Sequence, residues 1–223
     1  MKFKIVSLFV LCAILISCGT SRQGGKKQRK GTKAQVVLTP EQQRKYDYFF
    51  LEASRLKMKD DYSAAFDLLQ HCLTINPNAS SALYEISQYY MYLKQVPQGQ
   101  AALEKAVEND PDNYWYSQGL ASLYQQQNEM QKATNLLESM ATRFSDRMDP
   151  LYSLLDIYNR LEEYDNVITT LNRLEEKMGK NEQLSMEKFR IYLQKKDNQS
   201  AFREIESLVE EYPMAERQEG RSL

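Results

Sequence analysis

Few side chains in this chain of 223 residues could carry covalent or acid–base chemistry. The sequence contains one histidine, His71, and three cysteines, Cys12, Cys18 and Cys72. Because His71 and Cys72 are adjacent, they would point to different faces of a helix and cannot form a catalytic dyad. Metal sites need clustered His, Cys, Asp or Glu ligands, and the histidines and cysteines for such a cluster are missing. We therefore expect no enzyme, no bound metal and no cofactor.

Acidic pairs and glycine pairs add no catalytic motif. The pairs at 60–61 and 162–163 fall where turns between helices are expected, and acids there favour the start of the following helix. No predicted pocket supports a glycosidase with paired carboxylates. The glycines at 24–25 are followed by charged residues rather than by a strand and a helix, which argues against a phosphate-binding loop.

The elements that position these side chains repeat with a period of 34 residues. Blocks beginning at residues 46, 80, 114, 148 and 182 align without a gap as far as residue 215, so each residue has a column number within its repeat. The eleventh column holds Leu56, Tyr90, Tyr124, Tyr158 and Tyr192, the twentieth Ala65, Gly99, Ala133, Val167 and Ala201, and the twenty-fourth Leu69, Leu103, Leu137, Leu171 and Ile205. A repeat of this length predicts a stacked array, which usually serves as a binding surface.

The register resembles the tetratricopeptide repeat (TPR), a helix–turn–helix unit of the same length. The thirty-second column holds Pro77, Pro111 and Pro213 at the turn between repeats, with Ser145 and Gly179 in the other two units. The resemblance implies an all-α fold, a right-handed α-solenoid of five TPR units. We place the array at 39–215, with repeats at 46–79, 80–113, 114–147, 148–181 and 182–215. Helix A is predicted over about the first fourteen columns of each repeat and helix B from about the fifteenth to the thirtieth.

Several residues predict local structure within the array. Thr39, Pro40 and Gln42 form the pattern of a capped helix start, so the first helix should begin near residue 40. Gly99 replaces the usual alanine, and we interpret it as permitting a close helix contact rather than as a hinge. Cys72 falls in a column of apolar residues and should be a buried, unreactive thiol.

The residues after the fifth repeat predict that its last helix is not covered by a capping helix. Residues 216–223 form an irregular tail, too short for a good capping helix. We expect the fifth repeat to expose an apolar flank around Ile191, Ile205 and Leu208. Such a flank indicates either self-association or C-terminal repeats missing from a truncated array.

The start of the chain predicts export and lipidation. Lys2 and Lys4 precede an apolar run over 5–16, too short for a membrane span of roughly 20 residues but suited to a signal peptide at 1–17. Residues 15–18, Leu-Ile-Ser-Cys, resemble the lipobox of bacterial lipoproteins. The resemblance implies cleavage before Cys18 and acylation, with palmitate among the typical chains, of its sulfur and new amino group. An ordinary signal peptide with an incidental cysteine is the alternative.

Charge separates the next segment from the array. The lipidated Cys18 would begin a flexible linker, 18–38, which carries six basic residues and no acid. Two interpretations of this linker are possible. It lies on anionic head groups as a polybasic tether, or it acts as a soluble spacer. Residues 46–223 hold 19 of the 29 basic and 29 of the 30 acidic residues, a formal charge of −10. We expect membrane contact through the lipid and linker, and no nucleic acid.

Lipoprotein sorting signals give the expected location. An Asp directly after the lipidated cysteine resembles an inner-membrane retention signal, whereas Gly19 occupies that place here. The surface-export signal of some Bacteroidetes lipoproteins is an acidic run, and this linker is basic. The chain resembles a Bacteroidetes-like TPR lipoprotein that carries neither signal. The resemblance therefore implies a cell-envelope location, in the outer membrane and facing the periplasm.

The resemblance also implies a concave groove lined by helix A. Its candidate residues are Phe50, Tyr84, Gln88, Tyr92, Trp115, Gln118, Gln125, Tyr152 and Asn159. Aromatic and amide side chains suit an extended peptide, although the same types also serve as ordinary packing residues in helical arrays. Arg190 is the exception on a face otherwise nearly devoid of cations, so capture of a C-terminal carboxylate, as in chaperone-binding members of the family, is not expected.

Two functions follow from these expectations. The first is a lipid-anchored adaptor or scaffold that binds a protein or peptide partner in envelope assembly. The alternative is a ligand-capturing lipoprotein of a nutrient-uptake complex. Starch-binding lipoproteins with such repeats carry large extra segments that form the sugar site, and this sequence lacks them, which favours the adaptor.

Overall fold

The structure is a computed structural model that describes residues 37–211. The chain divides into two compact units, Met1–Ala34 and Gln35–Leu223, and every described helix belongs to the second. The predicted signal peptide, Cys18, almost all of the linker and the tail at 216–223 lie outside the described residues, as do the last residues of the fifth repeat.

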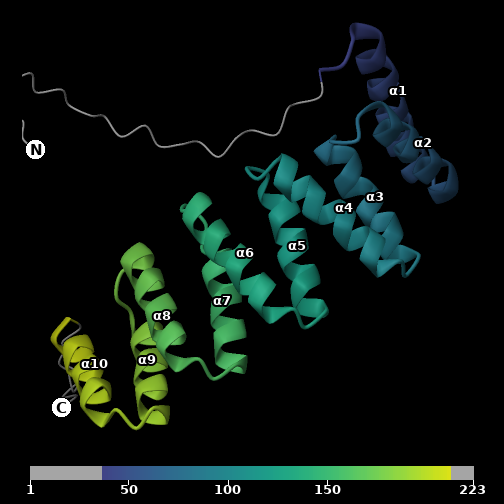
Figure 1. Ribbon diagram of the computed structural model, residues 1–223. Helices are drawn as coiled ribbons and strands as arrows, with labels where there is room; N and C mark the ends of the chain where they lie inside the picture. Colours follow the sequence, from purple (N-terminus) through teal and green to yellow (C-terminus); the bar gives the residue numbers. More distant parts are fainter. Residues whose placement is uncertain (1–36, 212–223) are drawn as a thin grey trace, which may run out of the picture. The chain divides into compact units, whose positions relative to one another are not determined.

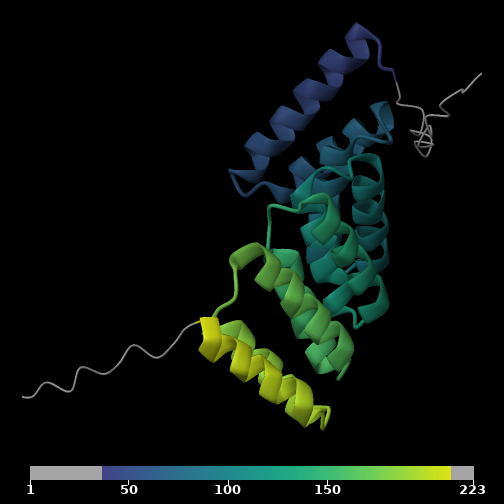
Figure 2. The ribbon, with the colours of Figure 1, turned by 90° about the vertical axis from the view of Figure 1, so that its left-hand side faces the viewer.

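Helices are the only regular secondary structure among the described residues, and they follow the 34-residue register (Figure 1). They are α1 (Pro40–Lys57), α2 (Tyr62–Ile75), α3 (Ser80–Tyr92), α4 (Val96–Asn109), α5 (Tyr114–Gln126), α6 (Met130–Arg143), α7 (Asp149–Arg160), α8 (Tyr164–Met178), α9 (Glu182–Gln194) and α10 (Asn198–Glu211). Odd-numbered helices are helix A and even-numbered helices are helix B of successive repeats. Each helix packs against the next one in sequence, and both views show them in that order (Figure 1 and Figure 2). The predicted all-α solenoid of TPR units is confirmed.

Every helix A ends in the same turn. Its fifteenth-column residue has a left-handed backbone, with φ between 56° and 61° at Asp60, Lys94, Asn128, Glu162 and Lys196. The next N–H donates to the carbonyl five residues back, as from Gln95 to Tyr90 at 2.8 Å and from Glu163 to Tyr158 at 2.9 Å. This is the Schellman arrangement, which satisfies the free carbonyls of a helix end. Because of this turn, helix B begins at the seventeenth column, about two residues later than predicted.

The helix starts follow local capping chemistry. Thr39 and Gln42 form the predicted capping box, with the Gln42 N–H donating to Thr39 Oγ1 at 3.2 Å. Asp61, from the first acidic pair, caps α2 by accepting from the Ala64 N–H at 3.2 Å. Asp61 therefore has a structural role, whereas Glu163 of the second pair precedes α8 without a side-chain cap.

The core lies between successive helices, as the columns predict. The leucines of the twenty-fourth column, Leu69, Leu103, Leu137 and Leu171, are buried. Cys72 is also buried, and its burial raises the pKa of the thiol to about 11, which confirms a thiol that stays protonated near neutral pH. A Cβ on Gly99 would lie 3.1 Å from the Ser87 carbonyl oxygen and from the Met91 side chain, so this glycine does permit a close approach of α4 to α3.

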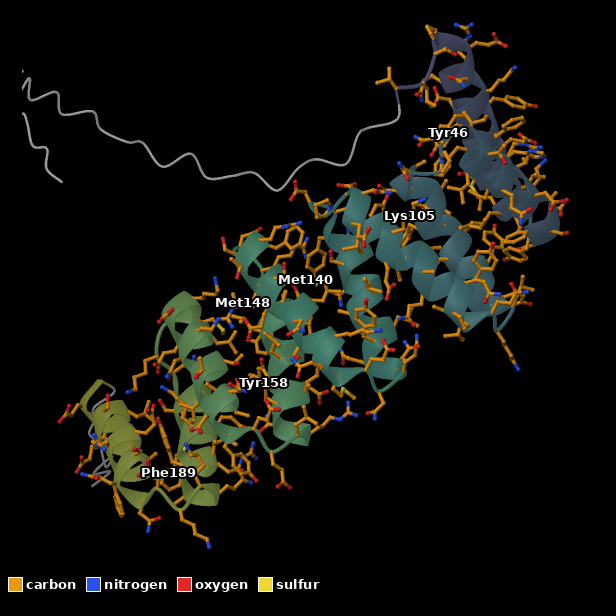
Figure 3. All side chains as sticks on the ribbon, in the orientation of Figure 1. Tyr46, Lys105, Met140, Met148, Tyr158 and Phe189 are labelled. Carbon is orange, nitrogen blue, oxygen red and sulfur yellow. The ribbon has the colours of Figure 1, made fainter. Side chains whose placement is uncertain are left out.

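Two tyrosines of the eleventh column bond to helix B of the preceding repeat. The Tyr124 hydroxyl donates to Glu104 Oε1 at 2.9 Å, and Tyr158 donates to Glu138 Oε1 at 3.3 Å, at equivalent columns (Tyr158 is labelled in Figure 3). Burial, and then the bond to Glu104, raise the pKa of the Tyr124 hydroxyl. These bonds fix one repeat against the previous one.

Lysines near the end of helix B form a second link between repeats. Lys105, labelled in Figure 3, donates to the Pro77 carbonyl oxygen at 2.6 Å, and Lys177 donates to the Ser145 carbonyl oxygen at 2.6 Å. Both acceptors belong to the thirty-second column of the preceding repeat. The links join only neighbouring repeats, as expected for a solenoid.

The fifth repeat differs from the prediction in which residues it exposes. Ile191 is buried, because the tenth column of helix A faces the preceding helix B, and the expectation that it forms an exposed flank is wrong. Ile205 and Leu208 are half-buried. The exposed apolar side chains of α10 are instead Phe202, 70% exposed, and Val209, 52% exposed.

A lysine occupies the core of the fifth repeat. Lys188 stands in the seventh column, where the second, third and fourth repeats have Ile86, Leu120 and Leu154. Its buried Nζ lies 2.9 Å from Glu175 Oε2 on α8 and 3.2 Å from Glu204 Oε1 on α10. Two carboxylates on different helices compensate the buried ammonium, so the charge connects α8, α9 and α10.

Candidate functional site

The candidate residues of helix A share one of its faces. Columns two, five, nine, twelve and thirteen lie on a common face by helical spacing. The tenth column faces the preceding helix B, since Phe66 on α2 lies 5.9 Å from Tyr89 on α3 between ring centroids. The eleventh column also contacts the preceding helix B, through Tyr124 and Tyr158.

The structure divides the predicted groove residues by exposure. Gln88, Tyr92, Trp115, Tyr152 and Asn159 are exposed, whereas Phe50, Tyr84, Gln118 and Gln125 are half-buried. Among the aromatic residues, Tyr92 is 81% exposed, Trp115 62% and Tyr152 48%. They come from α3, α5 and α7, three successive helices A. We call Tyr92, Trp115 and Tyr152 the aromatic surface.

Trp115 is held at the start of α5. Its backbone N–H donates to Asn113 Oδ1 at 3.1 Å. Its ring packs edge-to-face with that of Tyr114, with ring centroids 5.3 Å apart. The guanidinium of Arg147 lies 4.0 Å from the Tyr114 ring centroid and 5.6 Å from that of Trp115. Such cation–π contacts orient the indole without burying it. Arg147 also lies 3.8 Å from Asp149, so part of its charge is compensated.

One predicted groove residue connects helices, and a second stacks on a neighbour in its own helix. Tyr84 stacks on Tyr116 of α5 with ring centroids 4.8 Å apart. Phe50 stacks on Tyr46 at 5.9 Å, and the Tyr46 and Ser81 hydroxyls lie 3.0 Å apart in a hydrogen bond (Tyr46 is labelled in Figure 3). These rings serve packing between repeats at least as much as recognition.

Polar contacts orient some of the remaining candidates. The Tyr114 hydroxyl donates to Gln118 Oε1 at 2.5 Å, which turns that amide towards the start of α5. The Tyr152 hydroxyl donates to Met178 Sδ at 3.3 Å, which places a half-exposed thioether beside the ring. Gln88 Nε2 donates to its neighbour Ser87 at 3.2 Å.

The electrostatics differ from the prediction at one point. Arg190, the predicted lone cation, pairs with Glu187 on its own helix, and that hydrogen bond raises the pKa of the guanidinium. Arg147 is the cation that contacts the aromatic surface, and sequence reasoning missed it. It occupies the last column of its repeat, in the loop before α7, where helical periodicity assigns no face. The run Tyr-Trp-Tyr at 114–116 was the available signal.

A separate shallow hollow lies between α4 and α6. Val107 and Pro111 line it on one side, and Leu136 and Phe144 on the other. None of the nine predicted groove residues takes part in it. Within 37–211, no group of three or more His, Cys, Asp and Glu side chains is placed to hold a metal ion. The ten helices include none that is both long and apolar enough to cross a bilayer.

Comparison with known proteins supports the repeat assignment. Residues 80–113, the second repeat, match the tetratricopeptide repeat family. No protein of curated function matches the chain.

Solved structures share the fold at low sequence identity. A MamA crystal structure is 18% identical, with 78% of this chain and 98% of that one covered and a TM-score of 0.55. A tetratricopeptide repeat protein from Parabacteroides merdae ATCC 43184 is 16% identical, with 77% and 68% covered and a TM-score of 0.56. YrrB, described as a TPR protein with an unusual peptide-binding site, is 13% identical, with 74% and 86% covered and a TM-score of 0.53.

These structures show the fold, a helical-repeat array. The matched repeat and the four further units in phase with it support a tetratricopeptide repeat protein.

Proposed function

We propose that this chain is a lipid-anchored adaptor that binds a protein or peptide partner at the periplasmic face of the outer membrane, as a scaffold in envelope assembly. The anchor is the diacylated and N-acylated Cys18, followed by the basic linker. The array then presents its helix-A face to the partner.

The observation that carries the proposal is the aromatic surface. Tyr92, Trp115 and Tyr152 are large, exposed aromatic side chains on three successive helices A. Arg147 lies against the ring of Trp115, the central residue of the three. Tyrosine and tryptophan are enriched in interface hot spots because they bury large areas at low entropic cost. Amides at Gln88 and Asn159 on the same face can bond to the main chain of an extended peptide.

A site-specific crosslinking experiment in intact cells tests the partner surface. A photo-reactive phenylalanine analogue replaces Trp115 or Tyr152, and Tyr62 on α2 is the matched control because it is 47% exposed but lies on a helix B. We expect the same defined crosslinked band from both test positions and none from the control. Equal crosslinking at Tyr62 would reject the helix-A face as the binding site.

Fractionation and palmitate labelling test the anchor. Cys18→Ala should move the protein from the membrane to the soluble fraction and abolish labelling. Cys12→Ala is the matched control, because it removes a thiol from the apolar run but leaves the lipobox intact. If Cys18→Ala stays in the membrane fraction, the anchor assignment fails. Two or three acyl chains give stable membrane binding, at ~0.8 kcal/mol per buried CH₂, where one chain does not.

A further inference from the structure

The outer face of α10 is an apolar helix face that the described residues leave uncovered. In the first four repeats the following helix A packs on helix B, and none of the side chains in columns twenty-one and twenty-eight is exposed. Those eight residues are Phe66, Leu73, Gln100, Val107, Thr134, Ala141, Ile168 and Glu175. The same columns of α10 hold the exposed Phe202 and Val209, seven residues apart and so on one face. Four internal copies therefore show that a helix A is what covers this face.

At the other end of the array, the first helix A has no helix B before it among residues 37–211. In the third and tenth columns, the later repeats have buried or half-buried side chains: Ala82, Tyr89, Tyr116, Leu123, Pro150, Ile157, Leu184 and Ile191. On α1 the same columns hold Tyr48, 65% exposed, and Arg55, whose side chain is 45% exposed and pairs with Glu52 on the same helix. Leu51, also exposed, lies beside them. This end thus offers aromatic, apolar and cationic groups on one face.

The charges of the two end helices are complementary. Helix α10 carries four glutamates and one arginine, and Glu206 and Glu210 are exposed close to Phe202 and Val209 along the helix. Helix α1 carries four basic and three acidic residues. Pairing α10 with a second α10 would bring two acidic helices together, whereas α1 brings net positive charge to α10.

We propose that α1 of a second copy covers α10, so that copies of this chain join head to tail. The internal interfaces supply the register. Phe66 in column twenty-one contacts Tyr89 in column ten of the next repeat, and the same columns bring Phe202 to Arg55 of the second copy, a cation–π pair. Glu175 in column twenty-eight contacts Lys188 in column seven. The equivalent pair brings Val209 to Glu52 of the second copy, and Tyr48 lies one helical turn before Glu52 on α1.

This interface joins different surfaces of the two copies, so it does not close on itself in a dimer. A heterologous contact of this kind adds copies in an open series unless its rotation closes a ring. The 34-residue register would then continue from one chain to the next. The surface is distinct from the helix-A face that holds Trp115 and Tyr152.

Light scattering after size exclusion, with the full chain at several concentrations in constant mild detergent, tests the proposal. The natural chain should grow in mass with concentration through dimers to larger species. Phe202→Glu and Tyr48→Glu should each weaken association at least about tenfold. An equimolar mixture of the two variants should form a dimer and nothing larger, because one intact α1 face and one intact α10 face remain. Tyr62→Glu, an aromatic on α2 that is 47% exposed and lies on neither end face, is the control and should assemble like the natural chain.

The outcomes distinguish α1 of a second copy from other segments or proteins that could cover α10. A natural chain that stays monomeric at every soluble concentration overturns the proposal, and then another protein or the chain's own residues cover α10. If Tyr48→Glu associates normally while Phe202→Glu does not, the pairing is α10 to α10 and the head-to-tail assignment is wrong. A mixture of the two variants that stays monomeric also refutes it.

Discussion

The left-handed turn residue of each repeat predicts a gain in stability from glycine. Glu162 has φ of 56°, a conformation in which the Cβ of an L-residue crowds the following carbonyl. Glu162→Gly removes that crowding and retains the Schellman hydrogen bonds, which use only the main chain. Lys94, with φ of 59°, offers a second site of the same kind.

The expected gain is modest and can be estimated. The left-handed conformation costs a non-glycine residue roughly 1–2 kcal/mol. Glycine also makes the unfolded chain more flexible, which costs about 0.4–1 kcal/mol. Glu162→Gly should therefore raise the free energy of unfolding by about 0.5–1 kcal/mol. Asn128→Gly should gain less, because asparagine tolerates this conformation better than glutamate.

Urea denaturation followed by circular dichroism measures the effect as a shift in the transition midpoint. Glu162→Ala is the control, since alanine has the same Cβ and should leave the midpoint nearly unchanged. The reasoning fails if Glu162→Gly is no more stable than Glu162→Ala. It also fails if Asn128→Gly gains more than Glu162→Gly.

Three further predictions concern the interior. Lys188→Ala should destabilise the fifth repeat by roughly 2–4 kcal/mol, because it removes the buried ammonium between Glu175 and Glu204 and leaves Glu204 only the more distant Lys180, at 3.7 Å; amide exchange in α9 and α10 should rise while exchange in α5 stays constant. Gly99→Val should lower stability by about 1–3 kcal/mol, since its side chain meets the Ser87 carbonyl oxygen, and thermal unfolding measures this. In a fragment of residues 35–223, Cys72 should react with iodoacetamide only after unfolding. Because folding raises its thiol pKa to about 11, the thiol's contribution to stability is complete below the unfolded value and is lost as pH rises towards 11.

The repeat register could be predicted from the sequence because burial is periodic. A leucine or isoleucine at the same column of every repeat faces the same neighbour each time, so Leu69, Leu103 and Leu137 predicted one another's burial. The burial of Cys72 and the close helix contact at Gly99 could be predicted for the same reason, since each residue has the environment of its column. The second repeat matches the family directly.

Residues outside the regular columns were harder to predict. Arg147 lies in a loop, and its contact with Trp115 depends on how that loop folds back. Lys188 breaks an apolar column and is tolerated because Glu175 and Glu204 reach it from two other helices, a coincidence that no single segment reveals. The turn after helix A depends on a backbone angle at Lys94 and Glu162, residue types that give little warning of it.

The links between repeats also have a consequence for how the chain is made. Among the described residues, hydrogen bonds between helices span at most 35 positions, as from Tyr46 to Ser81 and from Arg173 to Glu138. Contacts this local close quickly and require no distant segment. As the polypeptide emerges from a ribosome or a translocon, each layer can complete its interior as soon as its successor has appeared. Synthesis and folding then advance together in one direction, with only the newest repeat unfinished at any moment.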